Sequence, residues 1–242
     1  MSEEKIIKHA HKAVHIAEDK TKPWRHKIKE LAEEIAIIVF AVGITLAFHN
    51  WNDWRSERKI EKEFLTGISY DLKKEAKSLD GGIKDLAKTA DYYDKVWEQI
   101  KRNQIDAAYV DSNSYQLINT SYFVFDNGRF EGFKSSGYLR LIENPTLLKD
   151  ITTMYTVEMP FQIKADDMMY ADRRTVYYQS IGVKAPMDTN EVVHLSKIIN
   201  DPAVRYQVVF FRHYMHERIR QKTTLAAKMR KLAAEIDKEL NK

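Results

Sequence analysis

The most apolar part of the chain lies near its N-terminus, where residues 35–48 form an uncharged run of 14. This run has no periodic polar face, which a helix packed on the surface of a soluble core should show. With its flanks, from Leu31 to Trp54, it makes about 36 Å of helix at roughly 1.5 Å per residue, enough to cross the hydrocarbon core. The pattern predicts a juxtamembrane and transmembrane helix over residues 23–54. The expected span residues are Ile35, Phe40, Gly43, Ala47 and Phe48, and the expected interface residues, an aromatic belt and a cation, are Trp51, Trp54 and Arg55.

Two other interpretations of this segment stay open. By length alone, an uncharged run of 14 residues is also typical of a buried core helix or of the apolar part of a signal peptide. In the first case the chain would be a soluble helical interaction protein with a core helix from Ile35 to Phe48. A cleaved signal peptide fits less well, because 34 residues precede the run and Trp51 crowds the small-x-small match that ends at Ala47. An uncleaved signal anchor is favoured over cleavage.

The charges beside the run barely distinguish its two orientations. Residues 15–34 carry five Lys and Arg, and residues 49–68 carry four, so the positive-inside rule rests on a single charge. A short N-terminal segment inside and a large domain outside is the simpler arrangement. We therefore predict a single-pass protein with a cytoplasmic N-terminus and a C-terminal domain outside the cytoplasm.

A seven-residue repeat follows the span and predicts a long stalk helix over residues 55–105. A strict repeat of this length indicates a left-handed supercoil seam. Gly81 and Gly82 are poor helix formers, but the seven-residue repeat continues past them without a shift. This predicts a kink or weak point within one helix. The seam residues are Leu65, Leu72, Leu79, Leu86, Tyr93 and Ile100, and a second row holds Ala76, Ile83, Ala90 and Trp97.

The C-terminal residues 201–242 repeat this design. Asp201 followed by Pro202 is a helix start signal, a capping carboxylate before Pro at the first helical position. Two apolar rows follow, and Lys222 is the only break in the first of them. Because each long helix must bury its apolar side, we expect this helix to return antiparallel along the stalk. The two rows are Val208, Met215, Met229 and Ile236, and Ile219, Ala226, Ala233 and Leu240.

Residues 106–200 between the long helices predict a small helical head. Gly137 is expected to end one short helix in a left-handed conformation, and Asn144 before Pro145 is expected to start the next. The pattern is helical from Thr146 to Tyr178, with a bend at Pro160, and residues 180–190 form a loop. At the other end, residues 1–22 are expected to be a solvated tail or an amphipathic helix on the inner leaflet.

Composition supports helices and excludes several function classes. Only 8 Gly and 5 Pro accompany abundant Lys, Glu, Ala and Leu, which favours long helices. The net charge of +4 comes from 39 basic and 35 acidic residues that are interspersed, which is no footprint for nucleic acid. The absence of Cys excludes disulfides, thiolate zinc sites and Cys nucleophiles.

Several clusters of polar residues could carry chemistry, but each is better explained structurally. The His pairs, with His9 beside the first, lack the partners or spacing of a metal site. Paired carboxylates could do acid and base work as in a hydrolase, but a solvated helix face is the simpler explanation. A K-S-S-G stretch lacks the spaced glycines of a phosphate loop. We predict no catalytic, cofactor or metal site. The clusters are His11 and His15; His213 and His216; Asp166, Asp167, Asp172, Arg173 and Arg174; and Lys134, Ser135, Ser136 and Gly137.

Two segments resemble signatures of a large uncharacterised family of bacterial single-span membrane proteins, a domain of unknown function. The first has a Glu before the span and AFHNWND with a following Arg after it, similar to the family's N-N-W-N-E-x-R-type box. The second, FEGFKSSGYLRLIEN, resembles the family's K-S-S-G segment. The resemblance covers residues 34–155, with departures at Ala41, His49 and Phe133. It implies a bacterial inner membrane location and no assigned activity.

The sequence therefore predicts an all-α protein: a transmembrane helix, a coiled-coil-like stalk, a helical head and an antiparallel C-terminal helix. The expected function is that of a non-enzymatic, membrane-anchored scaffold or sensor. Its expected partners are the lipid bilayer and either a second copy or another envelope protein. A second copy could pair through the stalk seam, which can be satisfied within one chain or by self-association, or through the small-xxx-small step of Gly43 and Ala47. No cofactor is expected.

Overall fold

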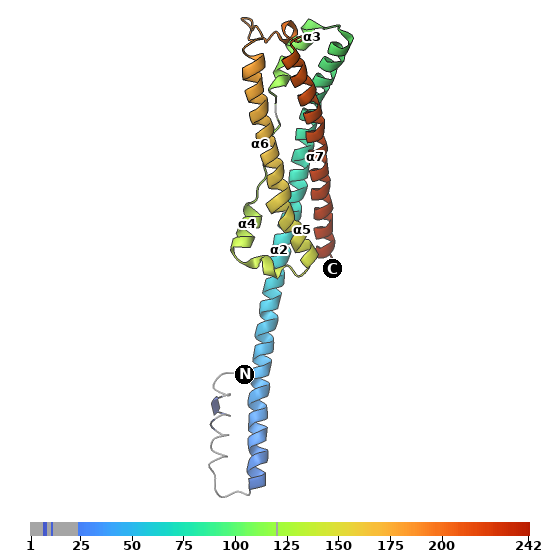
Figure 1. Cartoon of the computed structure of the whole chain (residues 1–242). Helices are drawn as coiled ribbons and strands as arrows, with labels where there is room; N and C mark the ends of the chain where they lie inside the picture. Colours follow the sequence, from blue (N-terminus) through green and yellow to red (C-terminus); the bar gives the residue numbers. More distant parts are fainter. Residues whose placement is uncertain (1–6, 9–10, 12–23, 120) are drawn as a thin grey trace. The chain divides into compact units, whose positions relative to one another are not determined.

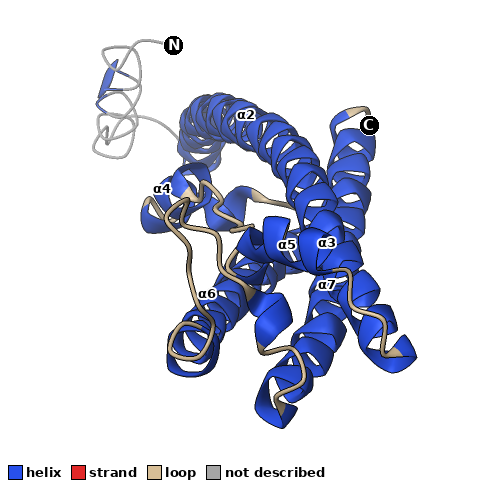
Figure 2. Ribbon diagram, turned by 90° about the horizontal axis from the view of Figure 1, so that it is seen from above, coloured by secondary structure: helices blue, strands red, loops and turns tan. Residues whose placement is uncertain are grey.

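The computed structural model describes residues 7, 8, 11, 24–119 and 121–242. In this part of the chain the fold is all-α, as predicted, and only an isolated bridge between Met187 and Val193 has β-type pairing. Figure 2 shows helices and loops without a strand. The chain forms two compact units, Met1–Glu61 and Lys62–Lys242. Most of the predicted tail 1–22, including His9 and His15, lies outside the described residues.

One helix, α2, runs from Trp24 to Arg102 and belongs to both units. It is 79 residues long and remains helical through Gly81 and Gly82, where the sequence predicts a kink or weak point. A Cβ atom on Gly82 would lie 2.6 Å from Ser121 Oγ, whereas one on Gly81 would meet nothing within 4 Å. Gly82 therefore lets the segment around Ser121 approach the helix closely.

Within the second unit, α7 (Pro202–Leu240) runs antiparallel to α2, as predicted (Figure 1). Asp201 caps its first turn by accepting a hydrogen bond from Ala203 N at 2.8 Å, and Pro202 follows the cap. Two polar contacts show that α2 and α7 are antiparallel. Lys73, early in the second unit's part of α2, meets the end of α7, whereas Asp94, later in α2, meets the first half of α7. Lys73 Nζ lies 2.6 Å from Asp237 Oδ2, and Arg212 Nε lies 2.5 Å from Asp94 Oδ1.

The two apolar seams are buried inside this bundle. All six stalk seam residues are at most 7% exposed, and so is the first row of α7. Lys222, the only polar member of that row, is 1% exposed. Members of the second rows with larger side chains, such as Trp97, are half-buried. The seven-residue repeats are thus satisfied within one chain.

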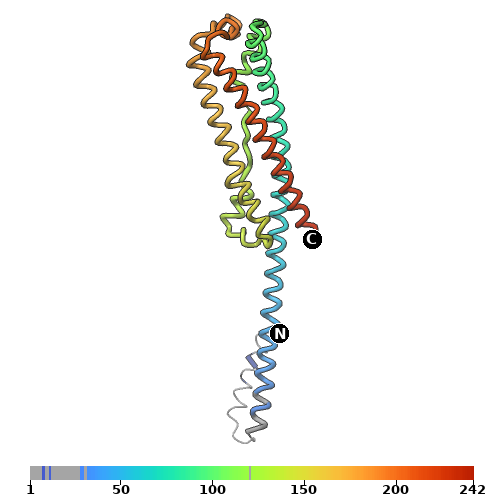
Figure 3. The backbone as a smooth tube through the Cα atoms, turned by 45° about the vertical axis from the view of Figure 1, so that its right-hand side comes forward, coloured from blue at the N-terminus to red at the C-terminus, as the bar shows by residue number. Residues whose placement is uncertain are grey.

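A third helical column runs from residue 145 to 181 beside α7 (Figures 1 and 3). It consists of α5 (Pro145–Thr153), a π-helical turn η3 (Met154–Glu158), α6 (Met159–Val176) and a second π-helical turn η4 (Tyr177–Ile181). Asn144 caps its start, as predicted, by accepting from Thr146 N at 3.1 Å. Pro160, which has no N–H to donate, is the second residue of α6, one residue after the end of the first π turn.

This column differs from the predicted head at the end of a two-helix stalk. Glu158 Oε1 lies 2.6 Å from Lys228 Nζ, and Ser180 Oγ lies 2.8 Å from Gln207 Nε2. These two contacts show that the column lies along α7 and runs antiparallel to it. Residues 62–242 consequently form one bundle of three long helices rather than a stalk with a separate head.

Short elements connect the three columns. The first of these connections contains α3 (Ala107–Ser112), η1 (Ser114–Leu117), α4 (Gly128–Ser135) and η2 (Tyr138–Leu141), and the last contains η5 (Leu195–Lys197). Gly137 has a φ of 72° after α4, which confirms the predicted left-handed cap. Gly137 N donates to Lys134 O at 3.0 Å, so this glycine and the preceding serines end a helix.

Candidate functional site

The described part of the chain contains one helix that is long and apolar enough to cross a membrane, near the N-terminus. Only 11% of its apolar stretch is buried. Phe40 is 70% exposed and Phe48 is 66% exposed, so these side chains are not part of a protein core. Thr45 Oγ1 donates to Ala41 O at 2.9 Å, which satisfies the hydroxyl within its own helix. Gly43 has open space around it.

Amphipathic and charged side chains follow this apolar stretch. Trp51 and Trp54 are 54% and 53% exposed. The Arg55 guanidinium lies 5.8 Å from the centre of the Trp51 ring, in the range of a cation–π contact. His49 Nε2 lies 3.4 Å from Asp53 Oδ2 one turn later. Trp side chains are enriched where transmembrane helices meet the membrane–water interface.

The second feature is a buried charge cluster, formed by Asp166 of α6 with Arg218 and Lys222 of α7. Each of the three side chains is 1% exposed. The prediction that Asp166 belongs to a solvated helix face is therefore wrong. The same prediction is wrong for Arg173, which is also 1% exposed, whereas Asp167, Asp172 and Arg174 are exposed as expected.

The Asp166 carboxylate is held from four directions. Its Oδ2 lies 2.7 Å from Lys222 Nζ and accepts a hydrogen bond from Phe123 N at 2.9 Å. Its Oδ1 accepts from Arg218 and, at 3.3 Å, from Gln162 Nε2. A buried carboxylate with this many donors fixes the positions of the groups around it.

The Lys222 ammonium also donates to Ser121 O at 3.1 Å, which ties the extended segment after η1 to α7. Burial lowers the pKa of Lys222, and the Asp166 carboxylate opposes that shift. The cluster thus joins three segments that are far apart in sequence: residues 121–123, α6 and α7. Its side chains are closed off from solvent and already bonded to one another, so their arrangement suits a structural lock better than catalysis on an external substrate.

Arg173, two turns further along α6, holds the backbone at the end of η1, a few residues before the segment 121–123. Its Nη2 donates to Gln116 O at 2.7 Å and to Leu117 O at 2.6 Å, and its Nη1 donates to Asn119 O at 2.5 Å. The guanidinium also lies 6.0 Å from the Tyr93 ring centre and 5.9 Å from that of Phe211. The Arg173 guanidinium thus donates to the backbone carbonyl groups at the end of η1 and holds that segment against α6.

The histidines of these clusters that the structure describes, His11, His213 and His216, are not brought together with carboxylates into a metal site. His11 and His213 are exposed, and His216 Nε2 lies 3.0 Å from Asp94 Oδ2. Among the described residues, no group of three or more His, Asp and Glu side chains could hold a metal ion.

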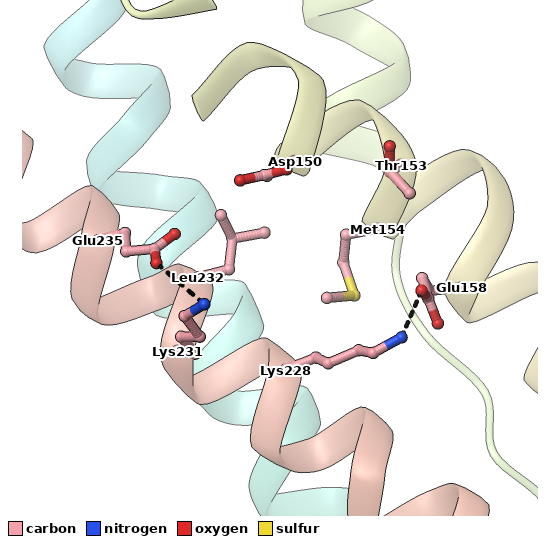
Figure 4. Close-up of a pocket in the computed structure, with 8 residues that line it drawn as sticks. All are labelled: Asp150, Thr153, Met154, Glu158, Lys228, Lys231, Leu232 and Glu235. Atoms are coloured by element: carbon pink, nitrogen blue, oxygen red, sulfur yellow. Dashed lines mark hydrogen bonds and ion pairs between the residues drawn. The ribbon is translucent and has the colours of Figure 1, made fainter. Parts of the chain in front are cut away.

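A shallow groove lies between the third column and α7 (Figure 4). Its volume is about 190 Å³, and its floor is formed by Met154 and Leu232. The charges on its walls are largely paired with each other: Lys228 with Glu158 at 2.6 Å, and Lys231 with a glutamate one turn later at 3.7 Å. The residues lining it are Asp150, Thr153, Met154, Glu158, Lys228, Lys231, Leu232 and Glu235.

Sequence comparison adds no relative to this description. No protein-family model, no curated protein and no solved structure matches the chain.

Proposed function

We propose that this chain is a single-pass, membrane-anchored helical protein that acts as a non-enzymatic scaffold or sensor. The observation that carries the proposal is the exposure of the apolar helix. Ile35, Phe40 and Phe48 are 49%, 70% and 66% exposed, although they belong to the most apolar stretch of the chain. Burying such side chains in lipid is favourable by about 0.8 kcal/mol per CH₂ group, whereas water would leave them unburied.

The location and orientation belong to the same proposal. The resemblance of the segments around Asn50 and Ser136 to bacterial single-span proteins supports a bacterial inner membrane. The short N-terminal segment stays in the cytoplasm, and the bundle lies outside it. The bundle then presents its surface to a partner in the cell envelope.

Self-association is proposed through the span rather than through the stalk. The stalk seam is buried against the chain's own helices, so it offers no free apolar surface. Gly43 and Ala47, in contrast, lie one turn apart on the exposed helix. Small residues at this spacing let two helices approach closely in lipid.

Two alternatives receive less support. A soluble interaction protein would bury the segment from Ile35 to Phe48 in its core, but only 11% of the apolar stretch is buried. A hydrolase using Asp166 and Asp167 would need two carboxylates that face a common substrate. One of the two is enclosed by cations and the other is exposed.

Membrane fractionation tests the proposal. The wild-type chain should stay in the membrane pellet during an alkaline carbonate wash and should be released by detergent. A Val42→Asp/Ile44→Asp variant should lose this retention, because each Asp near the centre of a span costs about 2.5–3.5 kcal/mol. Val124→Asp, at a position of the bundle that is 76% exposed, is the matched control and should remain membrane-bound. Recovery of the wild-type chain in the soluble fraction would contradict membrane anchoring.

A further inference from the structure

The helix α6 carries apolar side chains on the side that faces away from the bundle. Phe161 and Met168 are 60% and 57% exposed, and Ala171 is exposed as well. In contrast, three of the five buried residues of this helix are polar. A helix on the surface of a soluble bundle normally has the reverse distribution, with its apolar side inward. The outer face of α6 is therefore suited to contact with another molecule.

The exposed residues of α6 follow a seven-residue repeat of their own, which we call the outer row. Its members are spaced by three and four residues in alternation, as positions a and d are in a coiled coil. All five buried residues of α6 fall at positions b and f of the same repeat, on the opposite side of the helix. One helix thus has an inner face for its own bundle and an outer face with the spacing of a helix–helix seam. The outer row consists of Phe161 (a), Lys164 (d), Met168 (a), Ala171 (d) and Thr175 (a).

Three charged side chains of this outer face form no ion pair with any residue that the structure describes. Lys164 lies within the outer row, whereas Asp167 and Asp172 lie on its two sides, at positions g and e of the repeat. All three side chains are exposed. Another charge on this face, Arg174, lies over the Tyr178 ring at 5.8 Å. A partner therefore meets one free cation in the row and one free carboxylate on each side of it.

These charges argue against a second copy of the chain as the partner of this face. Two copies that stand side by side on one membrane would pair their α6 helices in parallel. Parallel pairing places equal d positions opposite each other and brings each g position close to an e position of the other helix. Lys164 would then meet Lys164 of the second copy, and Asp167 would meet Asp172. Like charges at these positions weaken a helix pair, and coiled coils exclude wrong partners in this way.

We propose that the outer face of α6 is the docking site for an amphipathic helix of a partner protein whose apolar row is flanked by Lys or Arg. The flanking cations meet Asp167 and Asp172, and a carboxylate within the partner's row meets Lys164. Burial of Phe161 and Met168 supplies the affinity, and the charges select the partner. This inference deepens the proposed scaffold role and rests on it, since the docked helix is what the anchored bundle holds at the membrane.

The probe for this site is a synthetic peptide of three heptads with Leu at a and d, one Glu at the central d position, and Lys at e and g. Lysine on both flanks also keeps the peptide from pairing with itself. Fluorescence anisotropy measures its binding to the full chain in detergent, and micelles without the protein give the background. The charge control is the same peptide with Glu at e and g. We expect saturable binding of the lysine peptide and binding of the glutamate peptide that is weaker by about tenfold or more.

Two double variants test the apolar and the charged parts of the site separately. Phe161→Ser/Met168→Ser should weaken binding of the lysine peptide about tenfold, and both side chains are exposed, so the bundle core is unchanged. Val124→Ser, at an exposed apolar position outside α6, is the matched control and should bind the peptide as the wild type does. Asp167→Lys/Asp172→Lys should reverse the preference, so that the glutamate peptide binds more tightly than the lysine peptide.

The proposal is overturned if the wild type binds the two peptides equally, or if Phe161→Ser/Met168→Ser binds the lysine peptide as tightly as the wild type does. A second copy as the occupant has its own readout, because the chain contains no Cys. If Met168→Cys forms a disulfide-linked dimer faster than Val124→Cys does, the face belongs to self-association and the proposal is overturned as well. Retention of the wild type in the carbonate wash without peptide binding would contradict this docking site and leave the membrane anchor intact. Charge-selective peptide binding by a chain that the wash releases would contradict the anchor alone.

Discussion

Asp166 and Asp167 are adjacent in the sequence but have opposite surroundings. Asp166 is 1% exposed and accepts hydrogen bonds or ion pairs from four groups, whereas Asp167 is exposed to solvent. One step along a helix rotates a side chain by about 100°, which separates the buried face from the solvated face. Two residues of the same chemical type therefore have different effects on stability.

This difference gives a prediction at the residue scale. Asp166→Asn should destabilise the bundle by about 3–5 kcal/mol, because Arg218 and Lys222 remain buried without their counter-charge. Asp167→Asn should change stability by less than about 0.5 kcal/mol, as for an ordinary surface substitution. Denaturant unfolding of the full chain in detergent, followed by circular dichroism, compares the two variants. Equal free energies of unfolding for the two variants would show that the buried charge cluster does not stabilise the bundle.

Of the three residues in this cluster, only Lys222 stands out in the sequence, as the single break in a seven-residue apolar row. The face of α6 that contacts α7 carries no such signal, because three of its five buried residues are polar. Apolar periodicity therefore cannot identify that face. The five are Met159, Gln162, Asp166, Met169 and Arg173.

At the scale of elements, the helix limits could be predicted because they follow from local chemistry. Asp201 before a proline, Asn144 before a proline and Gly137 after a short helix each behave as capping rules require. The partner of the third column could not be predicted in this way. Its helical pattern shows that an apolar face exists, but not which of the two long helices covers it.

The two adjacent glycines of α2 give a prediction for that element. Gly81→Ala should stabilise the helix by about 0.5–1 kcal/mol, because alanine lowers the entropy lost on folding and nothing lies within 4 Å of the new Cβ atom. Gly82→Ala should lose this gain, since its Cβ atom would lie 2.6 Å from Ser121 Oγ. Thermal unfolding of both variants measures the difference.

A double variant separates the steric effect from helix propensity. In a Ser121→Ala background the hydroxyl is gone, so Gly82→Ala should regain most of the stability that Gly81→Ala shows. The coupling between positions 82 and 121 should be about 1 kcal/mol, in the range measured for residues in contact. Additive effects of the two substitutions would contradict a close approach of this segment to α2.

At the scale of the whole molecule, the sequence predicts the span and the antiparallel pairing more readily than the bundle's third column. The span depends on composition over a single continuous stretch, and the pairing depends on two long repeats that each need a partner. The packing of residues 145–181 along α7 depends instead on contacts such as that of Glu158 with Lys228. The two residues are far apart in the sequence, and neither one identifies the other as its partner. Long-range pairing is the information that local patterns lack.

The final prediction concerns topology, where one positive charge separates the two orientations. The C-terminus belongs to the end of the bundle at which α2 enters it, because Asp237 contacts Ser69 at 2.5 Å and Lys73 at 2.6 Å. A reporter fused after Lys242 therefore leaves the buried charge cluster undisturbed. We expect alkaline phosphatase to be active after residue 242 and inactive after residue 5, since it requires an oxidising compartment for its disulfides. A fluorescent reporter that folds only in the cytoplasm should give the opposite pattern. Phosphatase activity at the N-terminal fusion alone would reverse the proposed orientation while leaving the span and the bundle intact.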